Sequence, residues 1–161
     1  MKTIIIYYSY SGNTKSVMES IHDKTNFDMI ALEPVIPYTS NYNTLVNEME
    51  NKESIDLTPQ IQHLSIDLNT YDAIILGTPV WWYTYPPVIN TFLKENDLKN
   101  KLIIPVITNG GWIGHTLDDI KKYVNIKYPL NLQFEGNNLV NKKDYDNWLK
   151  AIVNKEENYE C

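Results

Sequence analysis

The sequence predicts an α/β protein in which five parallel strands form one sheet with helices on both faces. Short apolar runs alternate with amphipathic helical patterns along the chain, which is typical of this class. Right-handed crossovers leave few topologies, and five strands favour the order 2-1-3-4-5 with a switch point between strands 1 and 3. The 161 residues are 43% hydrophobic and show no linker or internal repeat, so we expect one domain over residues 1–161.

The first third of the chain predicts two strands and two helices. Residues 3–8 are a continuous apolar run, typical of a strand buried on both faces. The helix that follows has its apolar face at Val17, Met18 and Ile21. Residues 27–33 predict the second strand. Residues 41–51 predict a helix, because apolar side chains recur there at i, i+3, i+4 and i+7.

The middle of the chain predicts a loop, a strand and a helix. Residues 53–70 have little pattern, so we expect a loop that packs through Ile61 and Leu64. Residues 72–77 predict the third strand. Pro86 and Pro87 are suited to open the next helix, since proline is tolerated in a first turn.

The last third predicts two strands and two helices. Residues 102–108 read as the fourth strand, but Pro105 removes a hydrogen-bond donor there, so either a bulge or a wrong strand assignment is expected. Apolar residues from Ile113 to Val124 follow at helical spacing. Residues 130–134 alternate as in an edge strand with one wet face, and Asn141 is suited to cap the last helix.

Charge and cysteine content exclude several classes. The net charge of −6 disfavours a general binder of nucleic acid or of anionic membranes, and no apolar run is long enough to span a bilayer. The one cysteine, Cys161, excludes an intramolecular disulfide and reads as a frayed terminal thiol. We therefore expect a cytoplasmic protein.

Three loops leave the carboxyl ends of the strands at the switch point, where open α/β sheets bind ligands. The first loop precedes a helix, whose N-terminal N–H groups favour a phosphate, although a plain capping turn would look the same. The second loop is rich in aromatic rings, which are either core caps or a platform for a flat ligand. The third loop has two glycines, which permit close approach of a ligand. The candidate residues are Ser9, Tyr10, Ser11, Gly12, Asn13 and Thr14 in the first loop, Thr78, Pro79, Val80, Trp81 and Trp82 in the second, and Thr108, Asn109, Gly110, Gly111 and Trp112 in the third.

The segments SYSGNT, GTPVWW and TNGGWIG, in this order and at these strand ends, resemble the flavodoxin-like family, and more narrowly its short bacterial members. The resemblance extends from residue 2 to about residue 152. It implies non-covalently bound FMN, with the 5′-phosphate held by the first loop and Tyr10 alongside. The candidate residues of the second and third loops would line the two sides of the isoalloxazine. It implies no catalytic side chain and no metal.

The second loop departs from the pattern of electron-shuttle flavodoxins, which usually carry a glycine, often beside an acidic residue, near the flavin N5. Residues 81–85 contain neither. The sequence therefore leaves two redox functions open: an electron carrier, or an NAD(P)H-dependent flavin or quinone reductase. The expected partner is a redox protein or a small flat electron donor or acceptor, and the chain is expected to be a monomer or homodimer.

Two readings lie outside redox chemistry. The chain could be a cofactor-free interaction module that uses its aromatic rim to bind a protein. A phosphorylatable receiver domain has the same strand order, but it needs acidic residues after strands 1 and 3, where this chain has Ser9 and Thr78. His115, after the third loop, is expected either at a helix start on the surface or against the flavin edge.

Overall fold

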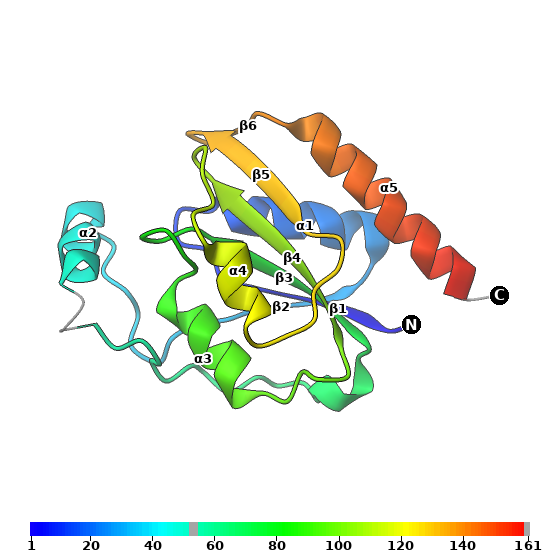
Figure 1. Cartoon of the computed structure of the whole chain (residues 1–161), viewed down its shortest axis with the longest axis horizontal. Helices are drawn as coiled ribbons and strands as arrows, with labels where there is room; N and C mark the ends of the chain where they lie inside the picture. Colours follow the sequence, from blue (N-terminus) through cyan, green and yellow to red (C-terminus); the bar gives the residue numbers. More distant parts are fainter. Residues whose placement is uncertain (52–54, 160–161) are drawn as a thin grey trace.

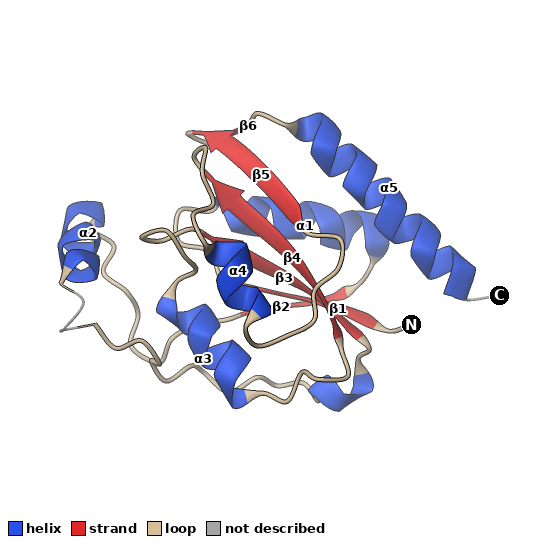
Figure 2. Ribbon diagram, viewed as in Figure 1, coloured by secondary structure: helices blue, strands red, loops and turns tan. Residues whose placement is uncertain are grey.

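One mixed sheet organises the protein (Figures 1 and 2). The structure, a computed structural model, describes residues 1–51 and 55–159, so Cys161 lies outside the described residues. The strands are β1 (Thr3–Tyr7), β2 (Asp28–Ala31), β3 (Ala73–Pro79), β4 (Leu102–Asn109), β5 (Leu130–Glu135) and β6 (Asn138–Leu139). The helices are α1 (Asn13–Thr25), α2 (Tyr42–Glu50), α3 (Pro87–Glu95), α4 (Thr116–Lys121) and α5 (Lys142–Tyr159), with a short 3₁₀ turn, η1, at Leu68–Thr70.

The strand order is β2-β1-β3-β4-β5-β6, so the predicted order 2-1-3-4-5 is confirmed. The sheet is not purely five-stranded, however. After β5 the chain turns at Gly136, which has φ +60°, and β6 returns antiparallel with Phe134 opposite Leu139. β5 is therefore not the edge strand that the sequence predicts, because β6 pairs on its outer side. Its predicted one-sided burial is confirmed, with Leu130, Leu132 and Phe134 inside.

Pro105 lies in β4 without a bulge. The pairing of β4 with β3 runs without a shift from Leu102 to Thr108. The backbone of Ile103 bonds toward the other side, to Asn125 and Lys127. Residues two apart in a parallel strand point their N–H groups to the same side, so Pro105 faces this side too. Pairing with β5 starts only at Val106, and the missing donor therefore falls in a gap of the ladder.

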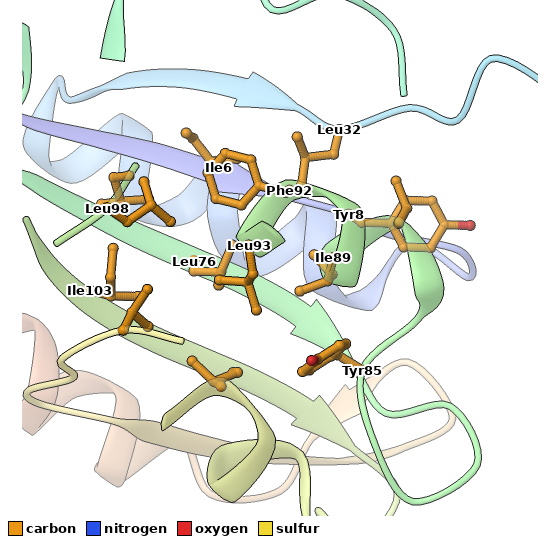
Figure 3. Close-up of a cluster of buried hydrophobic side chains, with 14 of the residues drawn as sticks. Ile6, Tyr8, Leu32, Leu76, Tyr85, Ile89, Phe92, Leu93, Leu98 and Ile103 are labelled. Carbon is orange, nitrogen blue, oxygen red and sulfur yellow. The ribbon is translucent and has the colours of Figure 1, made fainter. Parts of the chain in front are cut away.

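Alternating strand side chains feed two apolar cores, one on each face of the sheet. Ile4, Ile6, Ile74 and Leu76 pack with α3 and α4, whereas Ile5, Tyr7 and Ile75 pack with α1 and α5. Figure 3 shows the first core, with Phe92 and Leu93 of α3 over the strands and Tyr8 and Tyr85 near the carboxyl ends. Full burial of a side chain such as Phe92 contributes about 1.5–3 kcal/mol.

A close contact sets the position of α1 against the sheet. A Cβ at Gly77 in β3 would lie 2.7 Å from the Sδ of Met18 and 2.9 Å from the Cβ of Tyr7. Only glycine leaves room for α1 at this distance. The N-terminus of α1 is thereby held over the carboxyl ends of β1 and β3.

Some predicted boundaries are wrong. β2 is shorter than residues 27–33, and α4 has only six residues, with Ile113 and Val124 outside it. Asn141 takes the predicted N-cap position, where its backbone carbonyl accepts from the Asp144 and Tyr145 N–H groups, while its Oδ1 accepts from the Gln133 N–H and ties the helix to β5. The loop before β3 does pack through Ile61 and Leu64, and it also bridges to Pro34.

Candidate functional site

A cavity of about 520 Å³ opens at the carboxyl ends of the strands. This volume falls in the range of sites for small molecules and cofactors, roughly 300–1,000 Å³. All three predicted loops reach it, together with α2 and the turn after β5. Its lining residues are Tyr10, Ser11, Asn13, Tyr42, Leu45, Val46, Met49, Pro79, Val80, Trp81, Trp82, Thr108, Asn109, Gly110, Phe134 and Gly136.

The first loop ends in a helix start without a side-chain cap. Gly12 takes the N-cap position with φ +103°, a conformation that glycine adopts without strain. The Ser9 hydroxyl accepts from the Lys15 N–H at 3.1 Å, so Ser9 stabilises the first turn of α1 without lining the cavity. Among the described residues Ser11 Oγ has no hydrogen-bond partner, and it lies at the cavity wall. The N-terminal dipole and this hydroxyl suit an anionic group.

Two hydrogen bonds tie the first loop to distant strands. The hydroxyls of Thr14 and Thr108 are 2.7 Å apart and buried, which joins α1 to the end of β4. The Asn13 side chain donates to the Gly136 carbonyl at 2.9 Å, which joins α1 to the turn after β5. These two hydrogen bonds hold the start of α1 against β4 and against the turn after β5.

Trp81 belongs to a half-buried aromatic cluster with Tyr8, Tyr10 and Tyr38, which packs against the first core. Its ring meets all three edge-to-face, with centroid distances of 5.6, 5.4 and 4.9 Å. Burial, partly offset by the Val88 backbone N–H, raises the pKa of Tyr38 to about 12, and burial raises the pKa of Tyr8 further. Both hydroxyls therefore stay protonated at neutral pH. The cluster is therefore uncharged, and it borders the cavity through Tyr10 and Trp81.

Trp82 and Tyr83 form the tip of a tight hairpin. The backbones of Trp81 and Thr84 exchange two hydrogen bonds, at 2.6 and 3.1 Å. The two residues between them have φ +52° and +70°, which two-residue hairpins usually reserve for Asn and Gly. Bulky residues in this region carry backbone strain, and such strain gathers at functional sites.

Asp119 of α4 anchors this hairpin. Its carboxylate accepts from the Thr84 hydroxyl at 2.6 Å and from Lys122 Nζ at 2.8 Å, and it meets His115 Nδ1 at 2.5 Å. Partial burial alone would raise the pKa of Asp119, but the hydrogen bonds from Lys122, Thr84 and His115 outweigh it and hold the pKa below its ordinary value. His115 is thus an anchor of the hairpin at a helix start, and it does not line the cavity.

A second, exposed aromatic group lies at the cavity rim and consists of Trp82, Tyr83 and Trp112. The Tyr83 ring is 6.3 Å from that of Trp82 and 5.1 Å from that of Trp112. These side chains are 38%, 52% and 67% exposed. Gly114 fits against the hairpin, since a Cβ there would lie 2.2 Å from the Tyr83 carbonyl oxygen. The rim therefore presents large rings to solvent on a well-anchored support.

The third loop is held by its own asparagine. The Asn109 carboxamide donates to the Leu132 carbonyl at 3.1 Å and accepts from the Gly111 N–H at 2.9 Å. It also contacts the Asn131 side chain. These bonds leave Gly110 facing the cavity and turn Gly111 away from it.

Of the sixteen predicted residues, the cavity is lined by Tyr10, Ser11, Asn13, Pro79, Val80, Trp81, Trp82, Thr108, Asn109 and Gly110. The other six lie beside it. Ser9, Gly12, Thr14, Thr78 and Gly111 shape or support the loops, with Thr78 donating to the Pro79 carbonyl at 2.8 Å, and Trp112 stands on the rim. The roles of all sixteen in binding stay predictions.

Sequence reasoning missed six residues of the lining. Four are on α2, namely Tyr42, Leu45, Val46 and Met49, and two follow β5, namely Phe134 and Gly136. The residues at the end of β5 follow from the predicted topology, because the carboxyl ends of all parallel strands lie at the same edge of the sheet as the three loops. The α2 residues do not follow from it, because an amphipathic pattern does not say which surface the apolar face covers.

The cavity is chemically two-sided and uncharged. None of its described lining residues carries a formal charge. Hydroxyl and amide groups come from the first loop, α1, β4 and Tyr42, and apolar or aromatic side chains come from α2, the second loop and Phe134. Elsewhere in the described chain, no group of three His, Cys, Asp or Glu side chains is placed to hold a metal, and no helix is long and apolar enough to span a membrane.

The flavodoxin family model matches residues 2–156. The chain belongs to the flavodoxin family. No curated protein matches it significantly. The fold and the family agree, because the family match covers every strand and the three loops at the cavity.

Solved structures of two flavoproteins and of a flavodoxin share the architecture. A candidate flavoprotein from Bacteroides eggerthii DSM 20697 is 30% identical, with 94% of this chain and 98% of that chain covered and a TM-score of 0.75. A flavoprotein from Lactobacillus acidophilus NCFM, solved in complex with FMN, is 23% identical, with 91% and 97% covered and a TM-score of 0.71. A flavodoxin from the domain Archaea is 17% identical, with both chains fully covered and a TM-score of 0.56.

Proposed function

We propose that this protein binds FMN non-covalently in the cavity and carries electrons through it. The bound flavin would supply the redox chemistry, and the chain would supply orientation and shielding from solvent. We further expect a cytoplasmic location, and as partner a redox protein or a small flat electron donor or acceptor.

The two-sided cavity carries this proposal. FMN has an anionic phosphate at one end and a flat, largely apolar ring system at the other. The cavity lining includes the N-terminus of α1 with Ser11 and Asn13, which suit the phosphate, and Trp81, Trp82 and apolar residues, which suit the ring system. The complex of the Lactobacillus flavoprotein with FMN supports the same assignment.

The first experiment is a flavin-binding titration with a matched pair of serine variants. Ser11→Ala removes a hydroxyl donor from the cavity lining. We expect FMN to bind roughly tenfold more weakly, because a hydrogen bond to a charged group contributes about that much. Ser65→Ala, at an exposed position away from the cavity, is the control. Wild-type protein that binds neither FMN nor riboflavin would overturn the proposal and favour the cofactor-free interaction module.

A flavin or quinone reductase is the second candidate. The exposed group of Trp82, Tyr83 and Trp112 favours it, because a ledge of rings beside a flavin cavity suits a second flat substrate. The two functions separate when the FMN-loaded protein is mixed anaerobically with NADH or NADPH and no partner enzyme. A carrier stays oxidised, whereas a reductase bleaches its flavin absorption within a turnover.

A further inference from the structure

The helix α2 stands apart from the rest of the fold. Figure 1 shows it away from the sheet and the other helices, and none of its described residues belongs to either apolar core of the sheet. The chain before α2 and the chain after it pair antiparallel with each other. The Val35 N–H donates to the Gln60 carbonyl and the Gln62 N–H donates to the Glu33 carbonyl, both at 2.8 Å. The Tyr10 hydroxyl donates to the Thr39 carbonyl at 2.6 Å, just before the helix. These contacts place α2 beside the first loop.

The apolar face of α2 lacks an ordinary core partner. Leu45 and Met49 are only 4% and 9% exposed, yet both lie outside the two apolar cores of the sheet. Together with Val46 they line the cavity. A ligand in the cavity would therefore meet these side chains directly, and the contacts would add to the packing that already covers Leu45 and Met49.

The helix is also weak by itself. Nine residues are fewer than an isolated helix needs to be stable in water. Its last turn contains Glu48 and Glu50 and no basic residue, which opposes the helix dipole. Its local stability therefore depends on what its apolar face contacts.

We propose that Leu45, Val46 and Met49 of α2 are a wall of the flavin site that contacts the isoalloxazine ring. This rests on the proposed function. The wall offers no hydrogen-bond donor to a phosphate, whereas its apolar carbon and sulfur atoms suit an aromatic ring. The polar groups that suit the phosphate come instead from the first loop, α1 and β4.

Comparing FMN with riboflavin tests which end of the ligand α2 contacts. The double variant Leu45→Ala/Met49→Ala removes apolar contacts, and we expect it to weaken FMN and riboflavin by the same factor, roughly tenfold. The matched control Asn43→Ala/Asn47→Ala alters the exposed side of the same helix and should leave both affinities within about twofold. Ser11→Ala should weaken FMN and leave riboflavin unchanged.

Hydrogen exchange of the wild-type protein provides a test that needs no variant. Saturating FMN should slow the α2 amides by at least about tenfold and leave most of α5, on the opposite side of Figure 1, unchanged. Equal affinities of the wild type and the double variant, a loss confined to FMN, or unchanged α2 exchange would each overturn the wall and leave the proposed function standing. A wild-type protein that binds no flavin overturns the proposed function and the wall with it.

Discussion

Two neighbouring tryptophans, Trp81 and Trp82, take opposite roles at the cavity rim. Trp81 packs edge-to-face among three tyrosines, whereas Trp82 is 38% exposed beside Tyr83 and Trp112. Trp82 sits on a strained hairpin that costs stability, and Trp81 stabilises the aromatic cluster that borders the same cavity. A single aromatic run thus supplies both a structural anchor and a surface for recognition.

The largest effect should come from the half-buried cluster around Trp81. Trp81→Ala removes a large ring from three edge-to-face contacts, and we expect the free energy of unfolding to fall by about 3 kcal/mol. Urea denaturation followed by circular dichroism measures this. Trp112→Ala, at a 67% exposed ring, should change stability by less than about 0.5 kcal/mol. Equal losses in both variants would contradict the distinction between the clusters.

Gly114 tests how the exposed group is supported. Gly114→Ala puts a Cβ 2.2 Å from the Tyr83 carbonyl oxygen at a residue with φ +58°, so the hairpin must move. We expect a loss of about 2 kcal/mol and a changed near-ultraviolet circular dichroism spectrum from the rim tryptophans. Gly136→Ala has a similar φ of +60° with open space around it, and isolates the backbone strain from the clash. If the two variants lose the same stability, the clash contributes nothing.

Asp119 tests the electrostatic anchor of the hairpin and its pH dependence. Asp119→Asn weakens the bonds to Thr84, Lys122 and His115, and should cost about 1 kcal/mol at neutral pH. Because folding lowers the pKa of this carboxyl, its contribution is present above the ordinary value of 3.8 and is lost as pH falls through the lower folded value. The stability gap between wild type and variant should therefore close in acid. A gap that stays constant down to pH 2 would contradict the anchor.

The smallest effect should have the opposite sign. Replacing Trp82 and Tyr83 together by Asn and Gly, as Trp82→Asn/Tyr83→Gly, installs residues that accept positive φ. We expect stability to rise by about 0.5–1 kcal/mol while binding of a flat aromatic ligand at the rim weakens. Thermal unfolding and a quinone titration of the FMN-loaded protein measure the two quantities. A less stable variant would show that the rings stabilise the hairpin instead of straining it.

Sequence patterns predicted the sheet order and the three loops because both follow from local rules. Continuous apolar runs mark buried strands, and parallel strands deliver their following loops to one edge. Pro105 was the ambiguous point, since nothing local shows that β5 starts pairing only at Val106. Likewise the sequence places Asn141 before a helix, but only the contact with Gln133 decides that its side chain binds β5.

The sequence by itself determined the fold class, the chemistry of the three loops and the resemblance to the flavodoxin family. These depend on periodicity and residue type, which the chain carries locally. The tertiary structure decided which tryptophan packs among the tyrosines and that Asp119 anchors the hairpin. It also decided that the apolar face of α2 lines the cavity. Each of these depends on contacts between residues far apart in the chain, and an amphipathic or aromatic pattern does not name its partner.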